Sequence, residues 1–391
     1  MSEKQVVIVG GAVIGSAVAY FLTADPAFRG RVTVVEKDPS YAACATGRSA
    51  GGIRQQFSNP ENVAMSLFGI QFLRQAETLL AVEGTGPALS LREEGYLFLA
   101  TEKGLGVLKD NLAVQIEGGA DIAFFEPAAL KARFPWLTVD DLAGGSLGLS
   151  GEGWLDPYAL LQGFRRKARA QGAVYVTGEV TDLEMSGGQV AAARLADGQR
   201  LACDALVNAA GAFGGRLAEL AGVSLPVTPR KRLVFVVDCQ KPLPGCPLLI
   251  DPSGVYIRPE GAHFICGKAP DETDDPESQD FEIDYGFFEE QIWPVLAARI
   301  PALEAIKVVN AWAGHYDVNS FDHNVLLGPD PACPNFYCAN GFSGHGLQQS
   351  PAVGRALAEL IVQGTFQSLD LSRFSPARVA AGRPVVERNV V

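Results

Sequence analysis

The sequence predicts a mixed α/β fold built around a dinucleotide-binding βαβ unit, and three observations support this prediction. Residues 6–15 (VVIVGGAVIG) read as a β-strand that runs into a glycine turn and an apolar helix. Residues 31–36 (RVTVVE) read as the next strand, which ends on Glu36. A second glycine cluster, NGFSGHGLQQSP at 340–351, opens the last long helix. Glycine clusters at both ends of the chain indicate a cofactor that is bound from two sides.

The first glycine cluster has the residue types that a dinucleotide requires. Gly10 permits the tight turn, and Gly15 lets the helix pack closely on the strand. Backbone N–H groups at the helix start then face a pyrophosphate. Glu36 follows at about the 20-residue spacing expected of an acid that binds a ribose 2′-hydroxyl and repels a 2′-phosphate. The one departure is Ala12 at the middle glycine position, and the alternative is a purely structural glycine turn.

Composition limits the class of protein. A chain of 391 residues with 48% hydrophobic content is long enough for two domains around one cofactor. The net charge of −12 argues against nucleic acid or an anionic membrane as the main partner. The seven cysteines are scattered without a CxxC pair, which predicts reduced thiols and no metal site. We find no signal peptide and no apolar run of the ~20 residues that a membrane helix needs, so we expect a soluble, cytoplasmic protein.

Hydrophobic periodicity and turn residues predict the order of elements. A helix over 13–23 is followed by a turn-rich stretch, a helix that continues to about Leu80, and a strand over 96–100. Two helices come next, and then a helix that begins with Asp156 as N-cap and Pro157 as first residue. Further segments are predicted as strands over 174–177, 204–211, 231–237 and 254–267, a solvated acidic loop over 271–286, and a final core-facing helix over 351–363 that ends at Gly364.

Five motifs together resemble the D-amino-acid oxidase-like (DAO) family of FAD-dependent oxidoreductases, and the resemblance covers nearly the whole chain. They are GGAVIG, TGRSAGGIRQQFS, VNAAGAF, WAGHYD and GFSGHGLQQSP. The family includes sarcosine oxidase, dimethylglycine dehydrogenase, glycine oxidase and D-arginine dehydrogenase. GGIRQQFS, DPSGVYIRPEG and GFSGHGLQQSP are most similar to a mitochondrial branch of FAD-dependent oxidoreductase-domain proteins linked to complex I assembly.

The resemblance implies a Rossmann-like FAD-binding domain of the glutathione-reductase type. A discontinuous second domain, built on a mixed or antiparallel β-sheet, would bind the substrate. We expect the FAD-binding domain to comprise residues 1–85, 150–225 and 320–391, and the substrate-binding domain to comprise residues 86–149 and 226–319.

The resemblance also implies which residues bind FAD. The expected contacts of the ADP half, the pyrophosphate and the flavin are Gly10, Ala12, Val13, Ile14, Gly15, Glu36, Lys37, Thr46, Arg48, Ser49, Ala50, Gly51, Val180, Ala210, Gly211, Gly314, Gly341, Ser343, Gly344, His345, Gly346, Leu347 and Gln348.

Departures from the family pattern bear on how FAD is held and reoxidised. Gly314 stands where sarcosine oxidase-like enzymes have their FAD-linking cysteine, and the loop TGRSAGG lacks the histidine of dimethylglycine-type enzymes. We therefore expect non-covalent FAD. Ile265 stands where sarcosine oxidase has the lysine that supports reaction with oxygen, which favours a dehydrogenase over an oxidase. The electron acceptor is then oxygen or a respiratory or dye-type acceptor.

Candidate catalytic residues follow from what flavin-dependent amine oxidation requires, which is hydride transfer, a neutral amine and a cation that fixes the substrate carboxylate. His345 is the favoured histidine and His315 the second. The candidate carboxylate anchors are Arg258, Arg232 and Arg54, because arginine binds carboxylates through two hydrogen bonds. Tyr256 alternates with Arg258 on one strand and is expected to close over the ligand.

The sequence therefore predicts an FAD-dependent oxidoreductase that converts an amino acid or N-substituted amino acid to an imine, which then hydrolyses. Two alternatives stay open. One is oxidation of a 2-hydroxy acid on the same scaffold, and the other is a flavoprotein that acts in assembly without turnover. The expected partner is an amino-acid-like small molecule.

Overall fold

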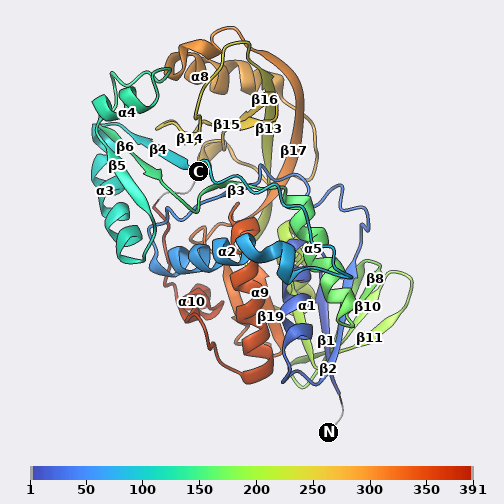
Figure 1. The fold of residues 1–391 in the computed structure, drawn as a ribbon. Helices are drawn as coiled ribbons and strands as arrows, with labels where there is room; N and C mark the ends of the chain where they lie inside the picture. The colour runs from blue at the N-terminus through green and yellow to red at the C-terminus, as the bar shows by residue number, and fades with distance from the viewer. Residues whose placement is uncertain (1–2, 389–391) are drawn as a thin grey trace.

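The computed structural model describes residues 3–388, which form two large β-sheets with helices packed on them (Figure 1). Every neighbouring pair in the six-stranded sheet is parallel except β18 with β19. In spatial order this sheet contains β18 (Leu326–Pro329), β19 (Phe336–Asn340), β12 (Ala205–Asn208), β1 (Lys4–Val9), β2 (Gly30–Glu36) and β8 (Val174–Thr177).

The second large sheet is mixed, because only its β14 and β4 pair in parallel. Its eight strands, in spatial order, are β17 (Lys307–Asn319), β13 (Val227–Asp238), β16 (His263–Gly267), β15 (Tyr256–Glu260), β14 (Leu248–Ile250), β4 (Tyr96–Ala100), β6 (Gly144–Gly148) and β5 (Ile122–Phe125). Two smaller sheets contain β9 (Val180–Ser186), β10 (Gln189–Leu195) and β11 (Arg200–Ala202), and β3 (Gly52–Ile53) with β7 (Gly153–Trp154).

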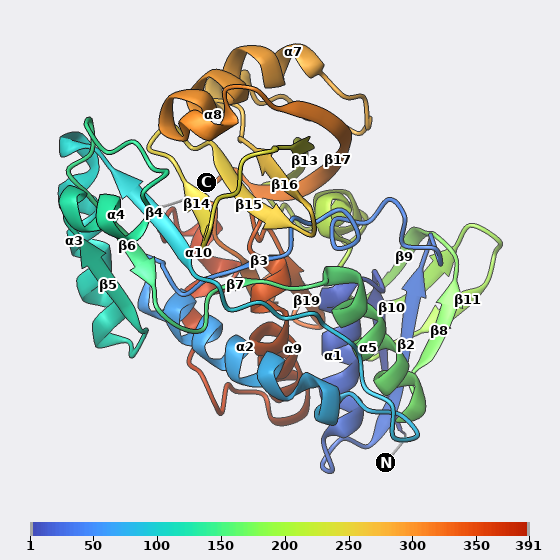
Figure 2. The ribbon, with the colours of Figure 1, turned by 45° about the horizontal axis from the view of Figure 1, so that its top comes forward.

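The predicted fold class is confirmed. A mainly parallel sheet carries the glycine turn at the end of β1, and a mixed sheet is formed by strands from two separate stretches of the chain. Figure 2 shows the mixed sheet lying above the parallel one, with the chain crossing between them several times. The exact division into two domains stays a prediction.

Helices cover both sheets (Figure 1). Buried apolar residues of α1, α5 and α9 form one core with the parallel sheet, and a second core lies between the mixed sheet and α8. The α-helices are α1 (Val13–Ala24), α2 (Pro60–Leu79), α3 (Glu102–Glu117), α4 (Pro127–Arg133), α5 (Pro157–Ala170), α6 (Gly214–Leu220), α7 (Tyr285–Phe287), α8 (Trp293–Arg299), α9 (Gly346–Gln363) and α10 (Ala377–Ala380).

Helices α1 and α9, from opposite ends of the sequence, cross at very small residues. A Cβ atom added at Gly354 would lie 2.8 Å from both the carbonyl carbon and the Cβ of Ala17. Only glycine lets the two backbones approach this closely. The crossing holds the starts of both helices on one side of the parallel sheet, where the two glycine clusters of the sequence meet.

The predicted elements agree with the structure at the N-cap of α5, where Asp156 accepts a hydrogen bond from the Ala159 amide at 3.0 Å. The last helix starts in the predicted glycine cluster, but five residues before the predicted span of 351–363. The helix begins at Gly346 and includes Pro351. The Leu347 carbonyl, which Pro351 cannot bond, accepts a hydrogen bond from the Ser350 hydroxyl at 2.8 Å.

The acidic segment at 271–286 is only partly the solvated loop that the sequence predicted. It contains a short 3₁₀ helix, Glu272–Asp274, and most of its side chains are exposed. Asp275, however, is only 13% exposed and forms an ion pair with Arg232 of β13. Local charge density gave no sign of this tertiary partner.

A buried carboxylate, Glu152, joins the loop before α2 to the mixed sheet. Its oxygens accept hydrogen bonds from the Gln55 amide at 2.5 Å and from Gln56 Nε2 at 2.8 Å. Gln56 Nε2 also donates to the Tyr96 carbonyl, and Gln56 Oε1 accepts from the Ser146 hydroxyl. Burial raises the pKa of Glu152 to about 7. This carboxylate fixes the backbone next to Arg54.

We expect Gly354→Ala to destabilise the protein by about 1–3 kcal/mol, because the new methyl group meets backbone atoms that cannot move aside. Gly106→Ala in α3 is the matched control, since a Cβ there meets nothing within 4 Å. It should stabilise by about 0.5–1 kcal/mol through helix propensity. Urea unfolding measures both free energies, and equal effects at the two sites would contradict the close approach of α1 and α9.

Glu152 should make stability depend on pH. The pKa of Glu152 is raised from 4.5 to about 7 in the folded protein. The stability that this shift contributes is therefore fully present below pH 4.5 and is lost as the pH rises through about 7. Between about pH 5 and about pH 8, wild type should lose on the order of 2 kcal/mol more than Glu152→Gln. Urea unfolding at both pH values tests this, with Glu117→Gln on the exposed face of α3 as control. Parallel pH profiles of wild type and Glu152→Gln would contradict it.

Candidate functional site

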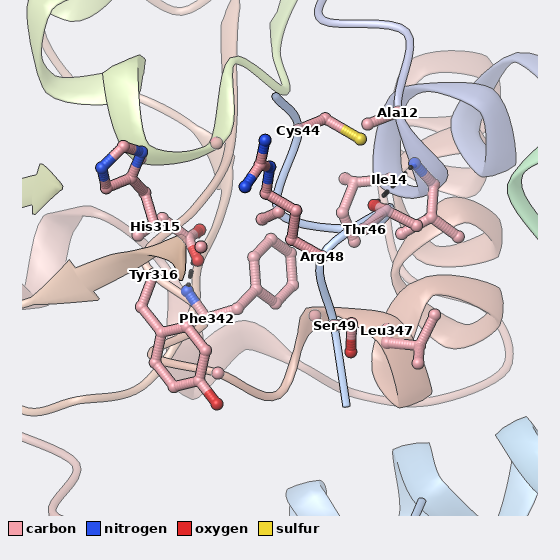
Figure 3. Close-up of a pocket in the computed structure, with 18 of the residues that line it drawn as sticks. Ala12, Ile14, Cys44, Thr46, Arg48, Ser49, His315, Tyr316, Phe342 and Leu347 are labelled. Carbon is pink, nitrogen blue, oxygen red and sulfur yellow. Dashed lines mark hydrogen bonds between the residues drawn. The ribbon is translucent and has the colours of Figure 1, made fainter. Parts of the chain in front are cut away.

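A cavity of about 710 Å³ runs between the two large sheets. It begins where β1, β2 and β12 end and continues to the start of α9, so the two glycine clusters line the same space. In Figure 3, Ala12, Ile14 and Leu347 lie on one side of this cavity, and His315 and Tyr316 lie on the other.

The glycine turn after β1 is held by close backbone contacts. Gly10 has a φ of +100°, and a Cβ there would lie 2.2 Å from the Ala209 carbonyl oxygen. A Cβ at Gly15 would lie 1.9 Å from the Gly10 carbonyl oxygen. Ala12 replaces the middle glycine without strain, because its φ is −69°. Ala12 gives α1 no side-chain cap, and the start of α1, where backbone N–H groups lack intrahelical partners, lines the cavity.

Glu36 is fixed at this end of the cavity. Its Oε2 accepts a hydrogen bond from the Gly11 amide at 2.8 Å, and its Oε1 accepts one from the Asp38 amide at 2.9 Å. Beside it, Lys37 Nζ lies 4.1 Å from the centre of the Phe213 ring. A carboxylate held next to a glycine turn suits the hydroxyl groups of a ribose.

The loop after β2 connects this end of the cavity to the mixed sheet. Arg48 Nη1 donates to the Ala313 carbonyl of β17 at 2.7 Å, and its guanidinium lies 4.1 Å from the centre of the Phe281 ring. In return, Trp312 Nε1 donates to the Arg48 carbonyl at 2.9 Å. Thr46 Oγ1 accepts from the Val13 amide at 3.4 Å. These contacts place the loop along the middle of the cavity (Figure 3).

The loop before α9 is anchored by Asp317. Its carboxylate accepts hydrogen bonds from the amides of Gly341 at 2.9 Å and Phe342 at 3.1 Å, and burial raises its pKa to about 6. Gly344 has a φ of +99°, and a Cβ there would lie 2.4 Å from the Tyr316 ring. His345 then gives α9 no side-chain cap. The start of α9, like that of α1, has backbone N–H groups without intrahelical partners and lines the cavity.

Arg54 is the buried cation of the cavity, with 4% of its surface exposed. Its Nη2 lies 2.9 Å from His345 Nε2, and its Nη1 lies 3.5 Å from the Tyr96 hydroxyl. Arginine can only donate, so His345 Nε2 is the acceptor and the imidazole is neutral. Burial, and then the charge of Arg54, hold the pKa of His345 well below its usual value.

Three tyrosines complete this part of the cavity, namely Tyr96, Tyr256 and Tyr316. Burial raises the pKa of each, so their hydroxyl groups stay protonated. The chamber between them therefore combines one buried cation with neutral hydrogen-bonding groups and aromatic walls. Such a chamber fits a small zwitterion or anion with an apolar body.

The structure brings most of the predicted residues together. His345, Arg54, Arg232, Tyr256 and His315 line the cavity, as do all the predicted FAD contacts except Gly15, Gly51 and Gly341. Gly15 packs against the turn, a Cβ at Gly51 would meet the Leu155 carbonyl at 2.4 Å, and Gly341 binds Asp317 through its amide. These three glycines shape the backbone around the cavity.

Arg258 does not line the cavity, unlike its strand neighbour Tyr256. Its Nε and Nη2 donate to the Ala50 carbonyl at 2.9 and 2.6 Å, and Nη1 donates to the Pro259 carbonyl at 2.7 Å. The guanidinium also lies over Trp154, 5.2 Å from the ring centre. These partners use its donors to hold the loop at Ala50, so the structure does not support Arg258 as a carboxylate anchor.

His315 lies at the cavity wall but faces the acidic segment. Its Nε2 lies 2.8 Å from the Asp280 carbonyl oxygen and its ring packs on Phe281. Because a carbonyl only accepts, Nε2 carries the proton, and burial lowers the pKa of this histidine. His263 and His323 do not line the cavity.

Sequence reasoning missed several residues of the chamber, chiefly Tyr96, Tyr316, Asp317 and Lys268. Tyr316 and Asp317 belong to the motif WAGHYD, in which only Gly314 and His315 were predicted to belong to the site. Within residues 3–388 no group of three or more His, Cys, Asp or Glu side chains could hold a metal ion. No helix in the same range is long and apolar enough to cross a membrane.

The residues present fit FAD. The uncapped starts of α1 and α9 suit the negative charge of a pyrophosphate and of a reduced flavin, and Glu36 suits the ribose. The backbone approaches at Gly10 and Gly344 exclude side chains where a flat or charged cofactor must come close.

Comparisons with known proteins agree with this fit. The family model described as FAD dependent oxidoreductase (DAO) matches residues 5–360. FAD-dependent oxidoreductase domain-containing protein 1 from Xenopus laevis is 45% identical over 100% of this chain and 85% of its own length. Glycine oxidase from Geobacillus kaustophilus (strain HTA426) is 28% identical over 96% of this chain and 97% of its own length.

Among solved structures, L-proline dehydrogenase from P. horikoshii superimposes with a TM-score of 0.86 at 25% identity. The match covers 98% of this chain and 99% of the dehydrogenase. A family match over most of the sequence, a close relative along the full chain and a shared fold lead to one conclusion. The chain belongs to the DAO family of FAD-dependent oxidoreductases.

Proposed function

We propose that this chain oxidises the C–N bond of an amino acid or N-substituted amino acid to an imine, which water then hydrolyses. The observation that carries the proposal is Arg54, a buried arginine that lines the cavity among aromatic side chains. A guanidinium in such a place binds a carboxylate strongly, because charge-assisted hydrogen bonds gain strength away from water. Relatives named glycine oxidase and L-proline dehydrogenase support a substrate with an α-carboxylate.

Bound FAD supplies the hydride acceptor for this oxidation. The glycine turn at Gly10, the start of α1 and Glu36 would hold its ADP half. The loop at Thr46 and Arg48 would hold its middle, and the start of α9 its flavin end. Backbone N–H groups at that helix start favour negative charge on the reduced flavin.

The chain's own residues bind and orient the substrate. Arg54 would fix the carboxylate and so set the direction in which the α-carbon points. His345 is a positioning residue, because its Nε2 lone pair accepts from Arg54 and does not serve as a base. The aromatic walls at Tyr96, Tyr256 and Tyr316 would exclude water around the reacting bond, so the amine enters in its neutral form.

We further propose a dehydrogenase with non-covalent FAD. Ile265 is buried in a small apolar cluster with Val234, Val236, Ala50 and Trp312, beside the loop that lines the cavity. No cationic side chain stands at this position. Gly314 lines the cavity but offers no nucleophile to the flavin.

We expect Arg54→Gln to raise the substrate concentration for half-maximal flavin reduction about a hundredfold while FAD stays bound, because the carboxylate loses a charged partner. Arg258→Gln should weaken FAD binding instead, since it releases the Ala50 carbonyl. Arg194→Gln, in an exposed ion pair with Glu184, is the control.

Anaerobic stopped-flow reduction with amino acids, N-methyl amino acids and 2-hydroxy acids measures these effects. Reduction by 2-hydroxy acids alone would replace the C–N assignment with C–O oxidation. A protein that holds FAD but is reduced by no member of the panel would favour a role in assembly.

Acid precipitation tests the cofactor linkage. We expect all flavin to stay in the supernatant, with the absorbance spectrum of free FAD, because Gly314 and the loop TGRSAGG lack the cysteine and the histidine to which relatives attach FAD. Flavin fluorescence in the pellet would show a covalent bond. Peptide mapping would then identify its attachment site, with Cys44 as the first candidate because it is the cavity-lining thiol of the described chain.

A further inference from the structure

A second arginine, Arg232, lines the same chamber as Arg54. It lies on β13 opposite Gly314 of β17, and its guanidinium is 5.3 Å from the centre of the Tyr316 ring. The charges of both arginines act on the Tyr316 hydroxyl and lower its pKa, although burial raises that pKa more. Tyr316 therefore lies within the electrostatic reach of two guanidinium groups, and the chamber has two arginines in its walls.

A carboxylate of the chain itself occupies Arg232. Asp275 accepts from Nη1 at 2.7 Å and from Nη2 at 2.8 Å, and the two side chains are only 13% and 14% exposed. The Nε of Arg232 is buried and has no hydrogen-bond partner in the described chain. The geometry is the paired one in which arginine binds a carboxylate ligand.

Lys268, another cation that lines the cavity, also lies near an aspartate. Its Nζ lies 3.8 Å from Oδ1 of Asp271. Asp271 and Asp275 flank the short 3₁₀ helix of the acidic segment. Arg232 and Lys268 are thus both paired with aspartates from one stretch of the chain.

The acidic segment is held on β13 mainly by surface contacts. Lys231 Nζ contacts Asp280 at 2.6 Å, and the Ser278 amide donates to the Pro229 carbonyl at 3.1 Å. Most side chains over 271–280 are exposed. Such contacts contribute little each, so residues 271–280 can leave β13 without opening an apolar core, while Phe281 and Ile283 stay packed against the core of the mixed sheet.

We propose that Arg232 is a second carboxylate-binding residue of the chamber and that the substrates are dicarboxylates, that is, amino acids with a further carboxylate on the side chain or the N-substituent. Asp275 occupies the site when no substrate is present. The inference rests on the proposed function, with Arg54 binding the α-carboxylate.

Exchange of one carboxylate for another explains why the site needs its own aspartate. A dicarboxylate that displaces Asp275 leaves Arg232 paired, and the displaced aspartate becomes hydrated by water. A monocarboxylate leaves Asp275 in place, so it gains nothing from Arg232. The internal carboxylate therefore prevents an unpaired buried cation in the free protein.

The test is a binding titration of the FAD-loaded protein, followed by the change in the visible flavin spectrum. The probes are succinate, glutarate and adipate, each compared with the monocarboxylate that lacks its second carboxyl group, namely propanoate, butanoate and pentanoate. None contains an amine, so binding is measured without turnover. The variants are Asp275→Asn, Arg232→Gln and the double variant Arg232→Gln/Asp275→Asn, which leaves no unpaired buried charge if Arg232→Gln fails to fold.

Asp275→Asn should bind the best dicarboxylate about tenfold more tightly than wild type, with monocarboxylate affinity unchanged. The variants that lack Arg232 should bind mono- and dicarboxylates alike. Asp280→Asn is the matched control, because it removes the same charge from the same segment but its partner Lys231 does not line the cavity.

Two results would overturn the proposal. Equal tightening of both ligand classes in Asp275→Asn would mean that the segment only covers the chamber, and a dicarboxylate preference that survives loss of Arg232 would place the second site elsewhere. Failure of the proposed function would give a different result. The protein would still bind dicarboxylates more tightly than monocarboxylates, but no amine would reduce the flavin.

Discussion

The structure depends on a stretch of buried backbone between the two large sheets, residues 48–57. Only two of these residues, Gly52–Ile53, lie in a strand, so the other polar backbone groups need side-chain partners. Distant residues supply them. Gln348 Oε1 accepts from the Arg54 amide at 2.6 Å, Glu152 from the Gln55 amide, and Trp312 and Arg258 donate to the carbonyls of Arg48 and Ala50. Helix α9, the residue before β7, and strands β15 and β17 are thereby tied to one segment, and that segment carries Arg54 into the cavity.

The need to satisfy buried polar groups also decides which partner each arginine binds. Arg258 and Arg48 serve the backbone, because carbonyl oxygens left without donors in the interior would destabilise the fold. Arg54 contacts a neutral histidine and a tyrosine, which orient it in the cavity. Arg232 is neutralised by an aspartate from the surface. The net charge of −12 says nothing about this arrangement, since the chemistry depends on which cation stands next to which anion.

The glycine clusters show how much of the site a sequence motif can predict. Their identity predicted the turn, the helix starts and FAD as the cofactor that the family binds, and FAD-dependence is confirmed by the family match. The individual glycines have different structural roles. Gly10 and Gly344 allow backbone to approach a carbonyl or a ring at the cavity wall, whereas Gly15, Gly51 and Gly341 shape backbone away from it. Spacing along the chain does not distinguish a glycine that faces a ligand from one that faces another turn.

The sequence by itself determined the βαβ unit, the acid at the end of β2, the cap at Asp156 and the family, because these follow from local periodicity and from residues close together in the chain. Only the tertiary structure decided that Arg54 and Arg232 line the chamber while Arg258 does not, that Tyr96 and Tyr316 line it, and that Asp275 pairs with Arg232. The physical reason is that a side chain's direction depends on strand register and on the partner packed against it. Those partners lie far away in sequence, as Arg258 and Ala50 do.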